Sequence, residues 1–183
     1  EKPALEKLEV SAPDLQTQKL ISNFLSSLDN KIELNFQINQ SYETISQAIF
    51  KEWFVNFNFP GIEGKFLNGI PSGWKIGTLQ ELIIQSKDTI NPVLSPDIEF
   101  YHYSIPAFDS GMKPVKENGS LILSNKFKVK SNSILLSKLN PRFPRLWPIQ
   151  EVDEDKSICS TEFLVLLPKK SIFFSYVTCF LKY

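Results

Sequence analysis

Residues 28–53 read LDNKIELNFQINQSYETISQAIFKEW, and they predict the dominant element of the fold. The stretch contains neither glycine nor proline, and a largely apolar stripe recurs along it at steps of three and four residues, close to the 3.6-residue period of an α-helix. At about 1.5 Å per residue, a helix from Leu28 to Trp53 would be roughly 38 Å long. The stripe consists of Leu28, Ile32, Asn35, Ile38, Tyr42, Ile45, Ile49 and Trp53.

Such a long helix with a narrow apolar stripe needs a partner along its whole length, as in a coiled coil. We therefore expect these eight side chains to pair with another long helix. Asn35 lies within the stripe and has two interpretations. It either fixes the register of the helix pair or lies at the wet edge of the stripe.

A shorter helix is expected before the long one. Pro13 and Asp14 are suited to its first turn, with Ser11 or Ala12 near the cap. Residues 1–12 then form the end of a preceding segment, and residues 13–59 form a helical spacer. The apolar face of the short helix comprises Leu15, Leu20, Ile21, Phe24 and Leu25.

The spacer runs into WFVNFNFPGIEGKFLNGIPSGW, residues 53–74, where six glycines and prolines cluster. This clustering predicts a linker over residues 60–72 and a domain boundary. Four aromatic side chains precede or enter the linker, and we interpret them as packing groups rather than a stacking platform for bases. They are Trp53, Phe54, Phe57 and Phe59.

Residues 73–183 predict a mixed α/β domain, so the fold class is α+β. WKIGTLQELI (74–83) should begin as a strand and become a short helix, and SIFFSYVTCFLKY (171–183) should be an amphipathic helix within a C-terminally truncated domain. Asn118-Gly119 is typical of a hairpin turn. Strands are expected at Tyr101–Ile105, Ser120–Leu123, Phe127–Val129, Ile134–Leu136 and Phe163–Leu167.

Charge is distributed unevenly in a chain whose formal net charge is zero. Between Lys113 and Arg145 there are eight basic residues and one acid, Glu117, a net charge of +7. We call this stretch the basic segment. A basic segment inside a neutral chain suits a DNA-contacting face. Cys159 and Cys179 lie in apolar surroundings and are expected to be reduced, buried thiols of a cytoplasmic protein. No apolar run is long enough to span a membrane.

Three lysines of the basic segment alternate with apolar residues in a way that predicts one strand face. Lys126, Lys128 and Lys130 would share that face, with Phe127 and Val129 on the other. They either contact DNA phosphates or protect an edge strand from aggregation.

SKLNPRFPR, residues 137–145, is the sharper candidate for DNA contact. Two prolines stiffen it, and it offers side chains that read base edges or bind phosphate. The alternative is a structural loop whose arginines pair with the acids at 151–155. The candidate residues are Lys138, Asn140, Arg142 and Arg145.

Catalysis is not expected. His102 is the only histidine and has no cysteine or carboxylate spacing that would make a metal site. Asp97 with Glu154 and Lys156 resembles the residue types of a metal-dependent nuclease, but the two carboxylates are far apart in sequence. No glycine-rich phosphate loop or nucleophile–base pair is visible.

The chain resembles the specificity (S) subunits of type I restriction–modification enzymes. KLEVSAPDLQTQKLISNFLSSLDNKIELNFQINQSYETISQAIFKEWFVNFNFP is similar to the central conserved region of that family. IPSGWKIGTLQELI is similar to the entry into a target recognition domain, and SKLNPRF and STEFLVLLP resemble segments inside such domains. Together these stretches cover nearly the whole chain.

The resemblance implies an architecture of two target recognition domains separated by two long antiparallel helices. This chain would hold the central helix and most of the second domain, read one half of a bipartite site in double-stranded DNA, and dock methyltransferase (M) subunits. S-adenosylmethionine, ATP and Mg²⁺ would belong to the M and restriction (R) subunits. With one recognition domain and the distal helix missing, the long helix is expected to form a homodimer. The alternative function is an assembly module that makes no DNA contact.

Overall fold

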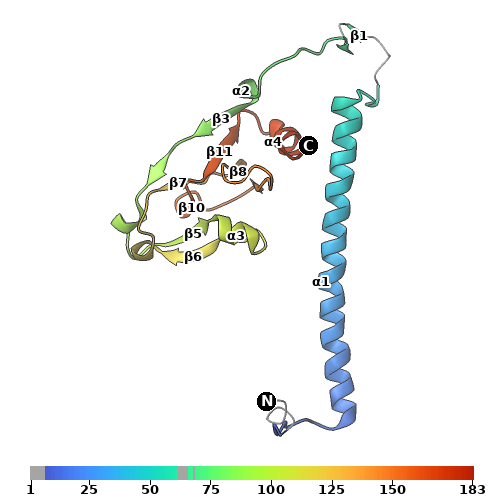
Figure 1. Ribbon diagram of the computed structural model, residues 1–183, viewed down its shortest axis with the longest axis vertical. Helices are drawn as coiled ribbons and strands as arrows, with labels where there is room; N and C mark the ends of the chain where they lie inside the picture. Colours follow the sequence, from blue (N-terminus) through green and yellow to red (C-terminus); the bar gives the residue numbers. More distant parts are fainter. Residues whose placement is uncertain (1–6, 62–65, 68) are drawn as a thin grey trace. The chain divides into compact units, whose positions relative to one another are not determined.

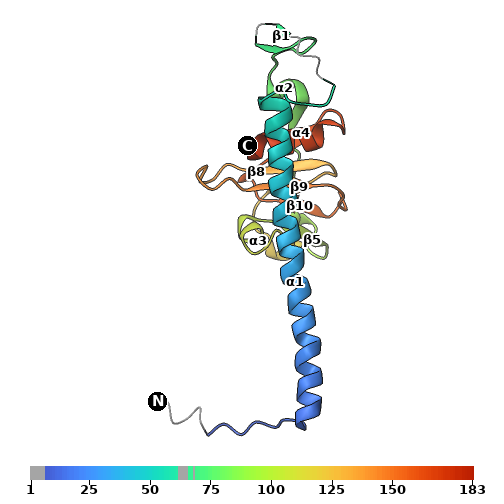
Figure 2. The same cartoon turned by 90° about the vertical axis from the view of Figure 1, so that its right-hand side faces the viewer.

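The computed structural model describes residues 7–61, 66–67 and 69–183. The chain divides into two compact units, one ending at Ser46 and the other running from Gln47 to Tyr183. The first is helical and the second contains the β-strands (Figures 1 and 2), so the fold class is α+β as predicted. The expected preceding segment, 1–12, and the expected linker, 60–72, lie partly outside the described residues.

A single helix, α1 (Leu15–Phe50), replaces the two helices expected from sequence. Its N-terminal cap is Asp14, whose Oδ1 accepts the backbone N–H groups of Gln16 (2.9 Å) and Thr17 (3.1 Å). The prediction of a separate short helix is wrong because nothing interrupts the chain between Leu25 and Leu28. The Ser27 hydroxyl donates back to the Phe24 carbonyl (2.7 Å) and so remains within the helix.

The helix is therefore longer than the sequence indicated. Its 36 residues correspond to about 54 Å, whereas the sequence predicted roughly 38 Å. It ends at Phe50, where a π-helical turn, Lys51–Val55, follows. Phe57 then has φ 61°, a left-handed conformation of the kind found after helix ends.

The segment that follows contains a small hairpin and one short helix. Strands β1 (Phe66–Leu67) and β2 (Ile70–Pro71) pair antiparallel inside the expected linker. Residues 75–78 are not a strand, contrary to expectation, but α2 (Leu79–Leu82) confirms the short helix. Its first turn is stabilised by Glu81, whose Oε1 accepts the Thr78 N–H (3.0 Å).

Two sheets form the body of the second unit (Figure 1). The four-stranded sheet is antiparallel, in the order β3 (Ile83–Ser86), β11 (Phe163–Pro168), β8 (Ser133–Ser137) and β9 (Leu146–Ile149). The five-stranded sheet has the order β4 (Thr89–Ile90), β7 (Lys126–Lys128), β10 (Ser157–Cys159), β5 (Glu99–Tyr103) and β6 (Val115–Asn118). Only its β10–β5 pair is parallel, so this sheet is mixed.

The main core lies between the two sheets. Leu135 and Val165 of the four-stranded sheet meet Tyr103 and Cys159 of the five-stranded sheet, and all four are buried. Ile134 faces the opposite side of β8, where it packs with Val177 of α4 (Phe173–Lys182). Because β8 is covered on both faces, its three central residues, 134–136, are all apolar rather than alternating. The helix α4 confirms the amphipathic helix expected at 171–183.

The cysteines are free, as expected. Cys159 is fully buried in the main core, and burial raises the pKa of its thiol to about 12. Cys179 is only partly buried, so the prediction that both thiols are buried holds for Cys159 alone.

Most expected strands correspond to observed ones, but the interval 118–123 does not. Strands β5, β7, β8 and β11 confirm four predictions to within a few residues. Ser120–Leu123 is not a strand, since Ser120 and Leu121 belong to a 3₁₀ turn, Gly119–Leu121, and Asn118-Gly119 is not a hairpin turn because β6 pairs with β5. Gly119 is buried against the backbone carbonyls of Pro92 and Ser95. Its lack of a Cβ permits this close approach.

Replacing Gly119 with Ala is expected to lower the free energy of unfolding by about 1–3 kcal/mol, because the new methyl group would overlap two backbone carbonyl oxygens. Denaturant unfolding of the two proteins measures the difference. Ser120→Ala, at the exposed neighbouring position, is the matched control and should unfold like the wild type. Equal stability of all three proteins would show that the two backbone segments separate at no cost.

Candidate nucleic-acid interface

The loop between β8 and β9 carries the exposed polar groups of the SKLNPRFPR stretch. We call residues 138–145 the β8–β9 loop. Its ends are held together because the Ser137 N–H donates to the Arg145 carbonyl (2.9 Å). The Lys138 N–H donates to the carbonyl of Glu162 (2.8 Å), which fixes the start of the loop against the turn before β11. The loop therefore projects from a hydrogen-bonded base.

The interior of the loop is also constrained. Asn140 has φ 52°, a left-handed conformation that asparagine tolerates better than most residues, and its carbonyl accepts the Phe143 N–H (2.9 Å). Pro141 lies within this turn and Pro144 follows it, and each fixes one backbone dihedral. A loop restricted in this way loses less conformational entropy when it binds a ligand.

Two of the four candidate side chains on this loop present charge to solvent. Lys138, Asn140 and Arg142 are all exposed, while Arg145 is only partly so. Phe143, between Arg142 and Pro144, is 66% exposed. The loop thus offers a cation, an amide, a guanidinium and an aromatic ring within six residues. These groups can bind phosphate and the edges of bases.

Arg145 is occupied by an ion pair that the sequence did not reveal. Its Nε donates to Asp109 Oδ1 (2.7 Å) and its Nη2 donates to Asp109 Oδ2 (2.9 Å). This hydrogen bonding holds the pKa of the Asp109 carboxyl below its usual range. The expected alternative, pairing with the acids at 151–155, is wrong for Arg145. Glu154 accepts the Ser131 N–H instead (2.9 Å).

Asp109 ends α3 (Ile105–Asp109), a short helix packed next to the loop's base. Ser104 caps this helix by accepting the Ala107 N–H (3.2 Å). The Phe108 ring meets Trp147 of β9 edge-on, with ring centroids 5.8 Å apart, and Tyr103 does the same from β5 at 4.8 Å. These contacts bring Asp109 to Arg145 across 36 residues of sequence.

The three alternating lysines have three different environments. Lys126 is 8% exposed, and its Nζ donates to the Ser124 hydroxyl. Burial lowers the pKa of Lys126. Lys130 lies beyond the end of β7 and forms an ion pair with Asp88 (2.7 Å). Lys128 is partly exposed within the strand. Their DNA contact stays a prediction, and Lys128 and Lys130 are the more accessible of the three.

Acids outside the basic segment offset much of its charge. Lys116 pairs with Glu99 (3.0 Å), Lys130 with Asp88 and Arg145 with Asp109. The net charge of +7 in sequence is therefore not a uniformly positive surface. Lys138 and Arg142 on the β8–β9 loop remain exposed.

The helix-pairing stripe is exposed along α1. Its six apolar side chains on this helix are between 39% and 68% exposed, and Asn35 is exposed too. Trp53, the last member, lies in the π-helical turn and is 39% exposed. An apolar stripe of this length in water predicts association.

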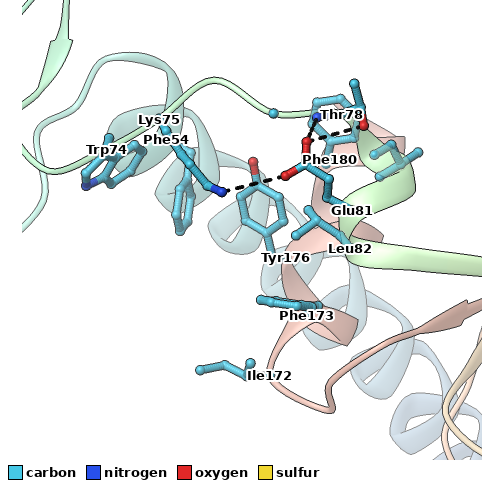
Figure 3. A pocket seen from close by; sticks show the side chains of 12 residues that line it. Phe54, Trp74, Lys75, Thr78, Glu81, Leu82, Ile172, Phe173, Tyr176 and Phe180 are labelled. Carbon is cyan, nitrogen blue, oxygen red and sulfur yellow. Dashed lines mark hydrogen bonds and ion pairs between the residues drawn. The ribbon is translucent and has the colours of Figure 1, made fainter.

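An aromatic cleft of about 500 Å³ lies in the second unit (Figure 3). Phe54 and Tyr176 meet edge-on at 4.9 Å, and Trp74 stacks on Phe59 at 5.3 Å. Together with Phe57, which meets Trp74 at 5.6 Å, these contacts confirm packing for three of the four expected aromatics. Lys75 and Glu81 form an ion pair at the cleft (3.8 Å). This lining suits packing rather than catalysis.

Neither a metal site nor a membrane span is found in the described part of the chain. No group of three or more histidine, cysteine or carboxylate residues is placed to hold a metal ion there. Likewise, no described helix is long and apolar enough to cross a bilayer. His102 pairs instead with the carboxylate of Glu117, Nδ1 to Oε2 at 2.5 Å.

The helical part of the chain is similar to known proteins. Residues 1–44 match a family described as the type I restriction modification DNA specificity domain. The type I restriction enzyme HindI specificity subunit of Haemophilus influenzae is 49% identical over 55 residues, which are 30% of this chain and 12% of that protein. The helical part of the chain is thus similar to the specificity subunits of type I restriction–modification enzymes.

A second specificity subunit and a solved structure extend the comparison. The MjaIX specificity subunit of Methanocaldococcus jannaschii is 29% identical over 85 residues, 43% of this chain and 19% of that protein. The crystal structure of the HsdS subunit from Thermoanaerobacter tengcongensis matches 63% of this chain and 31% of its own, with a TM-score of 0.50 and 23% identity, a likeness of fold. This chain spans 12% and 19% of the two curated relatives.

The ion pair between Asp109 and Arg145 predicts a pH dependence. Because the folded-state pKa of Asp109 is lowered, the pair stabilises the protein above the ordinary aspartate pKa of about 3.9, and this stabilisation is lost as the pH falls through the lowered value. In Arg145→Met, the pKa of Asp109 should rise towards the ordinary value. Carboxyl carbon NMR titration measures it, and Arg142→Met is the control that should leave it unchanged. An unchanged Asp109 pKa in Arg145→Met would contradict the ion pair.

Proposed function

We propose that this chain is the part of a type I specificity subunit that recognises one half of a bipartite DNA site. The observation that carries the proposal is the similarity of the helical part to type I specificity subunits, combined with a constrained, exposed β8–β9 loop. Lys138, Asn140 and Arg142 on this loop would contact DNA, with Lys128 as an additional phosphate contact; Lys130 would join them only where its ion pair with Asp88 opens. Arginine's planar fork can bind guanine O6 and N7 together, whereas a lysine acts as a point charge.

The chain would itself catalyse nothing. Methylation and DNA cleavage would be carried out by M and R subunits, which would supply the sites for S-adenosylmethionine, ATP and Mg²⁺. The chain would act in the cytoplasm, where DNA and these partners are present. Its helix α1 would pair with a second long helix and contribute to the docking of M subunits.

The length of α1 affects the distance that the helical spacer would set between the two halves of the DNA site. A helix of roughly 38 Å would match one turn of B-DNA, about 34–36 Å. At about 54 Å, α1 corresponds instead to about one and a half turns, so its ends need not lie over the same groove. The distance between the two halves of the DNA site would then depend on where the recognition domains attach.

A selection experiment tests the DNA-binding proposal. The complete specificity subunit containing this chain, bound to its M subunits, is incubated with a random duplex library, and bound DNA is sequenced over successive rounds. Enrichment of one bipartite motif is expected. Failure to enrich any motif, with equal binding to all sequences, would overturn the proposal in favour of an assembly module.

Two substitutions should separate base contacts from phosphate contacts. Arg142→Ala should weaken binding to the selected duplex by about 1–3 kcal/mol and barely affect a scrambled duplex, if this arginine contacts a base. Lys128→Ala should weaken both alike and reduce the slope of log K against log salt by about 0.9. Salt titrations on both duplexes measure these effects. Wild-type binding by Arg142→Ala would remove this residue from the interface.

The exposed stripe should drive self-association of the chain when no other long helix is present. Ile45→Glu places a charge on a stripe position that is 52% exposed in the unpaired helix, and it should shift the chain from dimer to monomer. Gln40→Glu adds the same charge near the opposite side of α1 and should leave the dimer intact. Light scattering at tens of micromolar distinguishes the two outcomes. A monomeric wild-type chain would contradict homodimer formation.

A further inference from the structure

The ion pair between α3 and the β8–β9 loop removes one arginine from the surface available to DNA. Asp109 uses both carboxylate oxygens to accept from Nε and Nη2 of Arg145, at 2.7 and 2.9 Å. The Arg145 side chain is 19% exposed, whereas that of Asp109 is 50% exposed. The guanidinium is thus the more enclosed partner, and its charge is neutralised where it lies.

Local structure gives no reason for an acid at position 109. Asp109 is the last residue of α3, and a negative charge at the C-terminal end of a helix is unfavourable. The contacts that hold α3 in place come from Phe108, Trp147 and Tyr103, which do not involve the carboxylate. The interaction that the carboxylate makes is with the loop, through Arg145.

Arg145 also closes the loop by its backbone. Its carbonyl accepts the Ser137 N–H (2.9 Å), so the residue that Asp109 holds is the one at which the loop rejoins the sheet. Immobilising Arg145 therefore restricts the direction in which Arg142 and Phe143 are presented. Two consequences follow from one carboxylate: a fixed loop base and a neutralised cation.

We propose that Asp109 is a positioning residue for DNA specificity, which holds Arg145 away from DNA and keeps the β8–β9 loop in its reading position. This inference rests on the proposed DNA-binding function. Without the carboxylate, the freed guanidinium would contact phosphates, which are the same in every sequence. Affinity for any DNA would rise while discrimination between sequences would fall.

The opposite direction of these two changes distinguishes the proposal from a purely structural role. A carboxylate that only stabilised the fold would, when removed, weaken binding to all DNA. One additional phosphate contact instead steepens the slope of log K against log salt by about 0.9, which is about 3.5-fold more affinity lost between 50 and 200 mM salt. The selected duplex should gain less than the scrambled one because its loop contacts are weakened.

The test uses the complete specificity subunit with its M subunits and two duplexes, the selected motif and its scrambled counterpart. In Asp109→Asn the scrambled duplex should bind more tightly at low salt, with the steeper slope, and the ratio of selected to scrambled affinity should fall. Asp97→Asn removes the same charge from an exposed position in the loop before β5 and should leave the ratio unchanged. Circular dichroism and thermal unfolding confirm that both variants are folded.

A second variant tests the arginine directly. Because Arg145 is held by Asp109, Arg145→Met should leave the salt slope as in the wild type and lower only the affinity for the selected duplex. In the double variant, the steeper slope of Asp109→Asn should disappear. A slope reduced by about 0.9 in Arg145→Met would mean that Arg145 already contacts phosphate, and the inference would be wrong.

Different results would reject the DNA-recognition function and the role of Asp109. If the wild-type complex does not distinguish the selected from the scrambled duplex, the DNA-recognition function fails and this inference fails with it. If the wild type discriminates and Asp109→Asn behaves like Asp97→Asn, only the role of Asp109 is rejected.

Discussion

Strand β8 is buried on both of its faces, and this burial governs the arrangement of the second unit. Leu135 faces the five-stranded sheet and Ile134 faces α4, and both are fully buried. A slip by one residue would turn Leu135 towards α4 and Ile134 towards the five-stranded sheet, where neither side chain would fit the close packing around it. The register of β8 with β9 and β11 is therefore fixed, and so is the point at which the β8–β9 loop leaves the sheet.

Rigidity at the base of this loop would suit the DNA recognition that we propose for it. The loop is bonded to the turn before β11 through Glu162, closed by Ser137 and Arg145, and joined to α3 by Asp109. The backbone at the base of the loop is therefore fixed, and only the exposed side chains beyond it can change conformation. A loop on a rigid scaffold can change its exposed side chains without changing the core beneath it.

The net charge counted along a stretch of sequence is a poor measure of the charge on the folded surface, as the basic segment shows. The basic segment has a net charge of +7, yet Glu99, Asp88 and Asp109 come from other parts of the chain to pair with three of its cations. Exposed pairs of this kind contribute little to stability. They nevertheless decide which cations are available to a polyanion, and so shape where DNA would bind.

Local patterns in the sequence were sufficient to predict the long helix, the α+β class and the position of the exposed loop. The helical period, the strand-like runs and the spacing of prolines are each visible within a few consecutive residues. The start of α1 and the turn at Gly119 were misplaced, because the first depended on the hydrogen bonds of Asp14 and the second on a contact with the Pro92 and Ser95 carbonyls. The burial of Lys126 and the pairing of Arg145 with Asp109 emerged from the folded chain alone. Burial and ion pairing join residues far apart in the chain, and no local pattern encodes such contacts.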